Sequence, residues 1–222
     1  DSVGRVLQTL KDLQLHQNTL VIFTSDNGPA SGMSSGPLRG TKGGKKYEGH
    51  MRVPTLAWWP DTIPAGSISK EIGVTTDLLP TLATLTQSQV PTDRIIDGKD
   101  ITDILLGKKA AQSPHQLHYY ENEGIRRGDW KLVQVRNTQS LNYREFKKGE
   151  TKLELYDLSK DLGERKDMSG KHPEMAKELD RLLQEHATSI AANLRPAGFA
   201  ENPKPILKEV GDIPTLKEYL GK

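Results

Sequence analysis

The sequence of 222 residues contains no cysteine. This absence excludes a disulfide framework, a thiolate metal site and a cysteine nucleophile. No apolar run approaches the length of a membrane span, so no membrane association is predicted. No signal-peptide pattern opens the sequence either, and the residues alone predict no cellular location.

The chain also lacks an excess of charge of either sign. Its 31 basic and 29 acidic residues leave a formal net charge of +2. This balance argues against a dedicated nucleic-acid-binding protein, which would carry a strongly basic face. The hydrophobic fraction of 34% and the length predict a globular chain with a modest core, as one large domain or two small ones.

One short stretch dominates what is present. Leu20–Thr24 is an apolar, β-branched and aromatic run that ends in Ser25, Asp26 and Asn27, followed by Gly28-Pro29. A short apolar run bounded by turn residues predicts a parallel strand that is buried on both faces. Open α/β sheets hold their ligands beyond the carboxyl ends of such strands.

We therefore expect Asp26 and Asn27 to lie side by side in a cleft. Their carboxylate and amide oxygens are ligands that a hard cation such as Ca²⁺ prefers. The alternative is a plain hairpin turn at Asn27-Gly28. A hairpin needs a second strand directly afterwards, whereas Pro29 and a segment rich in Gly, Ser and Lys follow.

The remaining patterns predict an αβ-type first part and a second part made of antiparallel strands. A polar linker near residues 108–114 suggests domains at 1–112 and 113–190, with an irregular, proline-containing tail at 191–222. The predicted helices are 2–13, 78–85, 101–106 and 173–187, and the predicted strands are 20–24, 55–59, 117–120, 124–127, 130–135 and 153–158.

Four stretches, in this order, resemble the C-terminal half of the sulfatases, arylsulfatase-like members of the alkaline-phosphatase-like superfamily. They are residues 3–28, residues 36–54 with Gly36-Pro37-Leu38-Arg39-Gly40-Thr41-Lys42-Gly43, Asp77–Leu82, and Arg126–Leu132 with Glu154–Leu158. The resemblance implies an α/β fold. Residues 1–112 would complete a large mixed sheet with flanking helices, and a small antiparallel sheet with a packed helix would follow.

The resemblance also implies site roles. It assigns Asp26 and Asn27 as Ca²⁺ ligands and Lys42 as the catalytic lysine that contacts the sulfate. The loop between Lys42 and Tyr47 is one residue longer than the family pattern, which makes Lys45 the competing lysine. His50 stands where the family usually has a glycine, and we interpret it as a hydrogen-bonded structural residue.

The family's nucleophile is a formylglycine made from the first residue of a Cys/Ser-x-Pro-x-Arg motif. Ser35–Arg39 has the bare spacing. We interpret it as a coincidence because it lacks the small residue after proline and the apolar helix that should follow. The chain is therefore expected to be a fragment that lacks the nucleophile half and is inactive alone.

The resemblance implies a sulfated small molecule or sulfated carbohydrate as substrate, with no nucleic-acid or membrane partner, and a periplasmic or secreted location. Two alternatives stay open. One is a phosphoesterase or phosphonate hydrolase of the same superfamily. The other is a non-catalytic module that binds sulfated polyanions through Lys42, Lys45 and Lys46.

Overall fold

The structure is a computed structural model that describes residues 1–136 and 151–194. The chain divides into two compact units, residues 1–188 and 189–222. The predicted irregular tail falls almost wholly outside the described residues, and the predicted domain boundary near residue 112 stays a prediction. No helix in the described segments combines the length and apolarity needed to cross a membrane.

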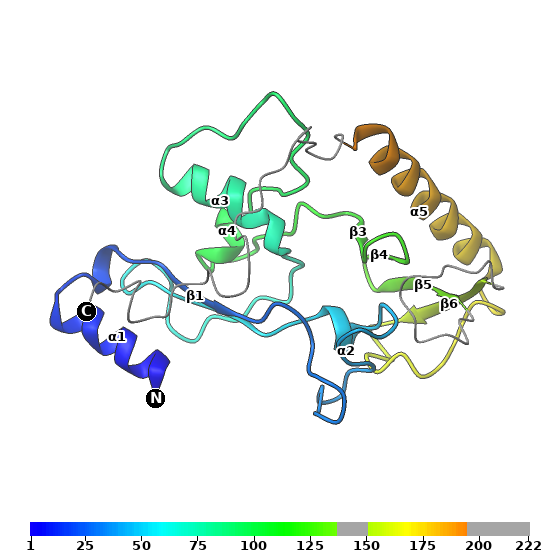
Figure 1. Cartoon of the computed structure of the whole chain (residues 1–222), viewed down its shortest axis with the longest axis horizontal. Coiled ribbons are helices and arrows are strands. Elements are labelled where there is room, and N and C mark those ends of the chain that lie inside the picture. Colours follow the sequence, from blue (N-terminus) through cyan, green and yellow to red (C-terminus); the bar gives the residue numbers. More distant parts are fainter. Residues whose placement is uncertain (137–150, 195–222) are drawn as a thin grey trace, which may run out of the picture. The chain divides into compact units, whose positions relative to one another are not determined.

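The first part of the chain is built around a two-stranded sheet (Figure 1). Strand β1 (Val21–Thr24) pairs antiparallel with β2 (Thr55–Trp58), so that Phe23 lies opposite Leu56. Helix α1 (Ser2–Asp12) and a 3₁₀ turn at His16–Asn18 precede β1, and the short helix α2 (Glu48–Met51) precedes β2.

The prediction that this strand is parallel and buried on both faces was wrong for the described chain. Its only partner among the described residues is the antiparallel β2. The side chains of Phe23 and Leu56 are 51% and 60% exposed, and α1 buries none of its own residues. An apolar run is buried only where neighbouring elements cover it, and the described residues leave Phe23 and Leu56 largely uncovered.

A second group of helices is organised by one buried carboxylate. A 3₁₀ turn at Thr75–Asp77 leads into α3 (Leu78–Leu85), and α4 (Thr102–Leu105) follows. Asp77, fully buried, accepts hydrogen bonds from the backbone N–H groups of Val74 and Lys99, each at 2.8 Å. His115 Nε2 lies 2.8 Å from the same carboxylate. Asp77 therefore joins three separate segments.

We expect Asp77→Asn to lower the free energy of unfolding by about 1–3 kcal/mol, because an amide has one oxygen and leaves a buried N–H without an acceptor. Chemical denaturation of the two proteins measures the difference. Asp103→Asn is the matched control, since the Asp103 side chain is 63% exposed in its ion pair with Lys108. Equal effects of the two substitutions would contradict the role assigned to Asp77.

The second sheet confirms the predicted antiparallel strands. It has the order β3 (His118–Tyr119), β4 (Gly124–Arg127), β5 (Trp130–Arg136) and β6 (Thr151–Asp157). Helix α5 (Pro173–Asn193) extends further than the predicted 173–187. Alternation along a strand sends successive side chains to opposite faces, and in β5 both faces are buried.

Each face of the second sheet has its own cover. One buried cluster contains Ile125, Leu132, Leu155, Ala176, Leu179 and Leu183, which places α5 on that face. The other contains Val133, Val135, Tyr156, Leu158 and Tyr47. Tyr47 comes from the segment between β1 and α2, so the lysine-containing loop covers the second face of this sheet.

Candidate functional site

Two backbone hydrogen bonds bring the parts of the predicted site together. The N–H of Gly28 donates to the carbonyl of His50 at 2.8 Å, and the N–H of Lys42 donates to the carbonyl of Pro29 at 2.8 Å. The segment directly after Asp26 and Asn27 therefore lies against the loop that carries Lys42. Residues far apart in sequence become neighbours at the end of β1.

Glycine is required where these backbones cross. A Cβ atom added to Gly28 would lie 1.9 Å from the carbonyl oxygen of Gly49, closer than any real contact. A Cβ atom on Gly49 would lie 2.5 Å from the carbonyl oxygens of Arg39 and Gly40. Only a residue without a side chain permits this approach.

Asp26 and Asn27 supply oxygen ligands of the type that Ca²⁺ takes, but too few of them. Asp26 is exposed and Asn27 is half-buried, with the hydroxyl of Ser25 donating to the Asn27 carbonyl at 2.9 Å. Ca²⁺ needs about six to eight oxygen ligands. Residues 1–136 and 151–194 contain no group of three or more His, Cys, Asp or Glu that could hold a metal. These two residues fit the ion in kind and could form only part of its shell.

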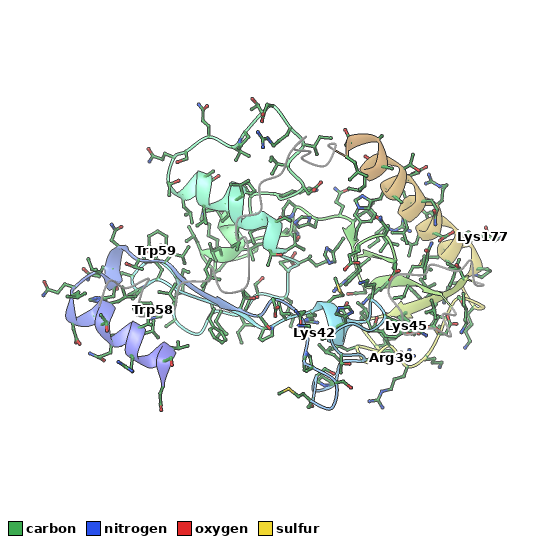
Figure 2. The ribbon with its side chains drawn as sticks, in the orientation of Figure 1. Arg39, Lys42, Lys45, Trp58, Trp59 and Lys177 are labelled. Carbon is green, nitrogen blue, oxygen red and sulfur yellow. The ribbon has the colours of Figure 1, made fainter. Side chains whose placement is uncertain are left out.

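The three lysines of the loop have different surroundings (Figure 2 labels Lys42 and Lys45). Lys42 and Lys45 are exposed. The Lys46 side chain is only 11% exposed, and its Nζ lies 2.9 Å from Glu121 Oε1 in the turn between β3 and β4. Lys46 thus fastens the loop to the second sheet and offers little charge to a ligand.

His50 has the structural role that the sequence suggested. Its Nδ1 lies 2.9 Å from the carbonyl oxygen of Gly44 and therefore carries the proton as the donor. This bond closes the bend formed by residues 44–50. The ring thereby braces the loop next to Lys42 and Lys45.

The residues at the two ends of the Ser35–Arg39 motif make structural hydrogen bonds. The Ser35 hydroxyl donates to the Leu38 carbonyl at 2.8 Å. Arg39 Nη1 donates to the carbonyl of Glu164 at 2.7 Å and to the hydroxyl of Tyr156 at 3.0 Å. Its guanidinium carbon lies 3.9 Å above the ring of Tyr47.

A buried group next to this loop was not predicted from the sequence. We call it the Glu48 cluster, and it consists of Glu48, Tyr120, Lys131 and Glu164. Lys131 Nζ, fully buried, donates to Glu48 Oε1 at 2.9 Å and lies 2.9 Å from Glu164 Oε1. Tyr120 donates to Glu48 Oε1 at 2.7 Å, and Lys131 Nζ lies 3.9 Å from the centre of the Tyr120 ring.

Burial and charge act in opposite directions on the two carboxylates of the Glu48 cluster. Burial is the largest single influence on Glu48 and pushes its pKa upward, but Lys131, the Tyr120 hydrogen bond and Arg126 together have the larger effect, and the pKa is lowered. Burial dominates at Glu164 and raises the pKa of that carboxyl. One sequence signal could have indicated the buried lysine. In the alternation of β5, Lys131 falls on the same face as the buried Val133 and Val135.

The chain is similar in sequence to known proteins. A family model described as Sulfatase matches residues 1–88, and one described as N-sulphoglucosamine sulphohydrolase, C-terminal, matches residues 45–191. The chain is 40% identical over 131 residues to N-acetylgalactosamine-6-sulfatase of Canis lupus familiaris, covering 56% of this chain and 24% of that protein. It is 30% identical over 206 residues to N-acetylgalactosamine-6-O-sulfatase of Bacteroides thetaiotaomicron, covering 82% of this chain and 39% of that protein.

The fold is shared as well. A sulfatase crystal structure from Pseudoalteromonas sp. superposes with a TM-score of 0.70 at 26% identity, covering 86% of this chain and 41% of that one. This similarity confirms the predicted α/β fold class. The chain spans less than half of the length of each of these proteins. Because family models match both its first part and residues 45–191, the chain belongs to the sulfatase family.

Proposed function

We propose that this chain forms the lysine-bearing part of a sulfatase that hydrolyses sulfate esters. The observation that carries this proposal is the pair of backbone bonds that sets the Asp26-Asn27 segment beside the Lys42 loop. In a member of the sulfatase family, these are the residues expected to act on the sulfate group. The formylglycine nucleophile would come from residues outside this chain, which would therefore be inactive alone.

In this proposal the role of Lys42 is electrostatic. Hydrolysis of a sulfate ester moves negative charge onto the sulfuryl oxygens and onto the leaving alcohol oxygen. An ammonium group held against those oxygens stabilises that charge. Lys42 is exposed and has no ion-pair partner in the described ranges, and its backbone is fixed by Pro29, so it is available for this contact.

Asp26 and Asn27 would contribute two oxygen ligands to a Ca²⁺ ion when it is bound. The ion would supply further positive charge next to the sulfate. Further ligands would be needed beside these two residues, because two oxygens leave most of the coordination shell unfilled.

The substrate class we propose is a sulfated carbohydrate. The relatives from dog and Bacteroides are both named for a 6-sulfated N-acetylgalactosamine. A periplasmic or secreted location stays a prediction.

The structure argues against one of the two alternative functions, the polyanion-binding module, and does not separate the other, the phosphoesterase, from a sulfatase. A polyanion-binding module would need several unpaired lysines, and the pairing of Lys46 with Glu121 removes one of the three. A phosphoesterase or phosphonate hydrolase of the same superfamily would use the same oxygen ligands. Its nucleophile and its preference for phosphate over sulfate esters would separate it from a sulfatase.

A chimera tests the proposal. In it, this chain replaces the matched segment of the Bacteroides thetaiotaomicron enzyme, which then supplies the nucleophile. We expect 4-nitrophenyl sulfate to be hydrolysed in preference to 4-nitrophenyl phosphate, and the isolated chain to hydrolyse neither. Preference for phosphate would favour the phosphoesterase. Salt-sensitive binding of heparin without turnover would favour the binding module.

A further inference from the structure

The Glu48 cluster is an unusual way to hold a small protein together. The side chains of Lys131 and Glu164 are fully buried and that of Glu48 nearly so. Taking such charges out of water is expensive, and apolar side chains of similar volume often give equal or greater stability. Burial alone therefore does not explain why charged groups occupy this position. Buried ion pairs can instead fix one geometry among several that an apolar contact would allow.

The cluster fixes the geometry of the loop through the backbone of Glu48. The N–H of Glu48 donates to Glu164 Oε2 at 2.6 Å, and its carboxylate is held by Lys131 and Tyr120. Both the backbone and the side chain of this residue are thus bound to the second sheet and the segment after it. Glu48 has little freedom to shift or rotate.

The next two residues transmit this position to the candidate site. The N–H of Gly49 donates to the Arg39 carbonyl at 2.7 Å, and the carbonyl of His50 accepts from the N–H of Gly28 at 2.8 Å. The first bond holds the part of the loop, at Arg39, that leads to Lys42. The second holds the segment that follows Asp26 and Asn27.

We propose that Glu48 and Lys131 are positioning residues, which couple the second sheet to both halves of the sulfate site, the Lys42 loop and the Asp26–Gly28 segment. The second sheet is then part of the catalytic apparatus and not an appended module. The role as part of a sulfate site rests on the proposed function. The mechanical coupling itself rests only on the hydrogen bonds.

Amide hydrogen exchange of the isolated chain, read residue by residue by NMR, tests the coupling. Glu48→Gln keeps the shape and an acceptor oxygen and removes the charge. We expect it to raise the exchange rates of the Gly28, Lys42 and Gly49 amides about tenfold or more, because local opening becomes easier. The amides of β4 and β5 should change by less than about twofold.

The matched control is Glu178→Gln, the same substitution at an exposed carboxylate. Glu178 pairs with Arg127 through two contacts of 2.7 and 3.0 Å. The Glu178→Gln substitution should leave the exchange rates of the Gly28, Lys42 and Gly49 amides unchanged. If Glu48→Gln prevents folding, Tyr120→Phe removes one hydrogen bond to Glu48 and keeps the ring. It should produce the same localised pattern at smaller amplitude.

A uniform rise of all amide rates in Glu48→Gln, or no rise at the three loop amides, would overturn the proposal, since either result means no directed coupling. The readout needs no turnover, so it is independent of whether the chimera hydrolyses sulfate. Where the chimera is active, Glu48→Gln should lower kcat more than it raises KM, because a displaced lysine loses contacts made in the transition state. If the chimera without further substitutions is inactive, and Glu48→Gln still gives the localised exchange pattern in the isolated chain, the sulfatase function is rejected and the coupling is retained.

Discussion

Lys42→Ala is expected to lower kcat of the active chimera about a hundredfold or more, with a much smaller change in KM. Removing one preorganised group that faces developing charge costs on the order of a hundredfold in rate. The effect falls on kcat because charge on the sulfuryl oxygens grows as the bond to the leaving group breaks. Steady-state kinetics on one sulfate ester measures both constants.

Lys45→Ala is the matched control in the same loop. Lys45 is exposed like Lys42, but no backbone bond to the segment after Asn27 holds it. Its replacement should cost less than about tenfold in kcat, as expected of a solvated charge. The reverse result, a crippled Lys45→Ala and a nearly normal Lys42→Ala, would show that the extra loop residue shifts the role to Lys45.

Lys131→Met should lower the free energy of unfolding of the chain by about 3–5 kcal/mol, the cost typical of breaking a buried ion pair by removing one partner. The substitution leaves Glu48 and Glu164 buried with no cation between them. Methionine fills a similar volume, so the loss reports the missing charge and not a cavity. Urea unfolding followed by circular dichroism gives the difference.

Lys152→Met provides the comparison, because Lys152 also bridges two carboxylates. Its side chain is 62% exposed, with Nζ at 3.4 Å from Glu154 and 3.2 Å from Asp167. Water screens such pairs, so this variant should unfold close to the wild type. A Lys131→Met protein as stable as Lys152→Met would mean that the Glu48 cluster has no electrostatic importance.

Local patterns in the sequence predicted the elements well. The alternation in residues 117–135 and 153–158 gave the four strands of the second sheet, and Arg127-Gly128-Asp129 gave the turn between β4 and β5. The presence of four characteristic stretches in one order predicted the sulfatase family. These signals are local, since each depends on side-chain periodicity or turn chemistry within a few residues.

Long-range features were predicted poorly. The run at Leu20–Thr24 was interpreted as buried and parallel, but burial depends on which elements lie beside a strand and not on its composition. The Glu48 cluster was missed because its members are separated by up to 116 residues, the separation between Glu48 and Glu164. Spacing along the chain contains no information about such contacts. The contact of Lys46 with Glu121 was missed for the same reason.

The crossing of Gly28 with Gly49 has a practical consequence for protein engineering. Together with the bond from Lys42 to Pro29, it closes the segment from Ala30 to Thr41 into a loop whose ends are fixed. Ser31–Ser34 at its tip are exposed. Because lengthening a loop with anchored ends costs little free energy, a peptide tag inserted at Gly32 should be accepted without moving Lys42. The tip of this loop is thus a suitable place to attach an affinity handle or a fluorescent reporter next to the candidate site.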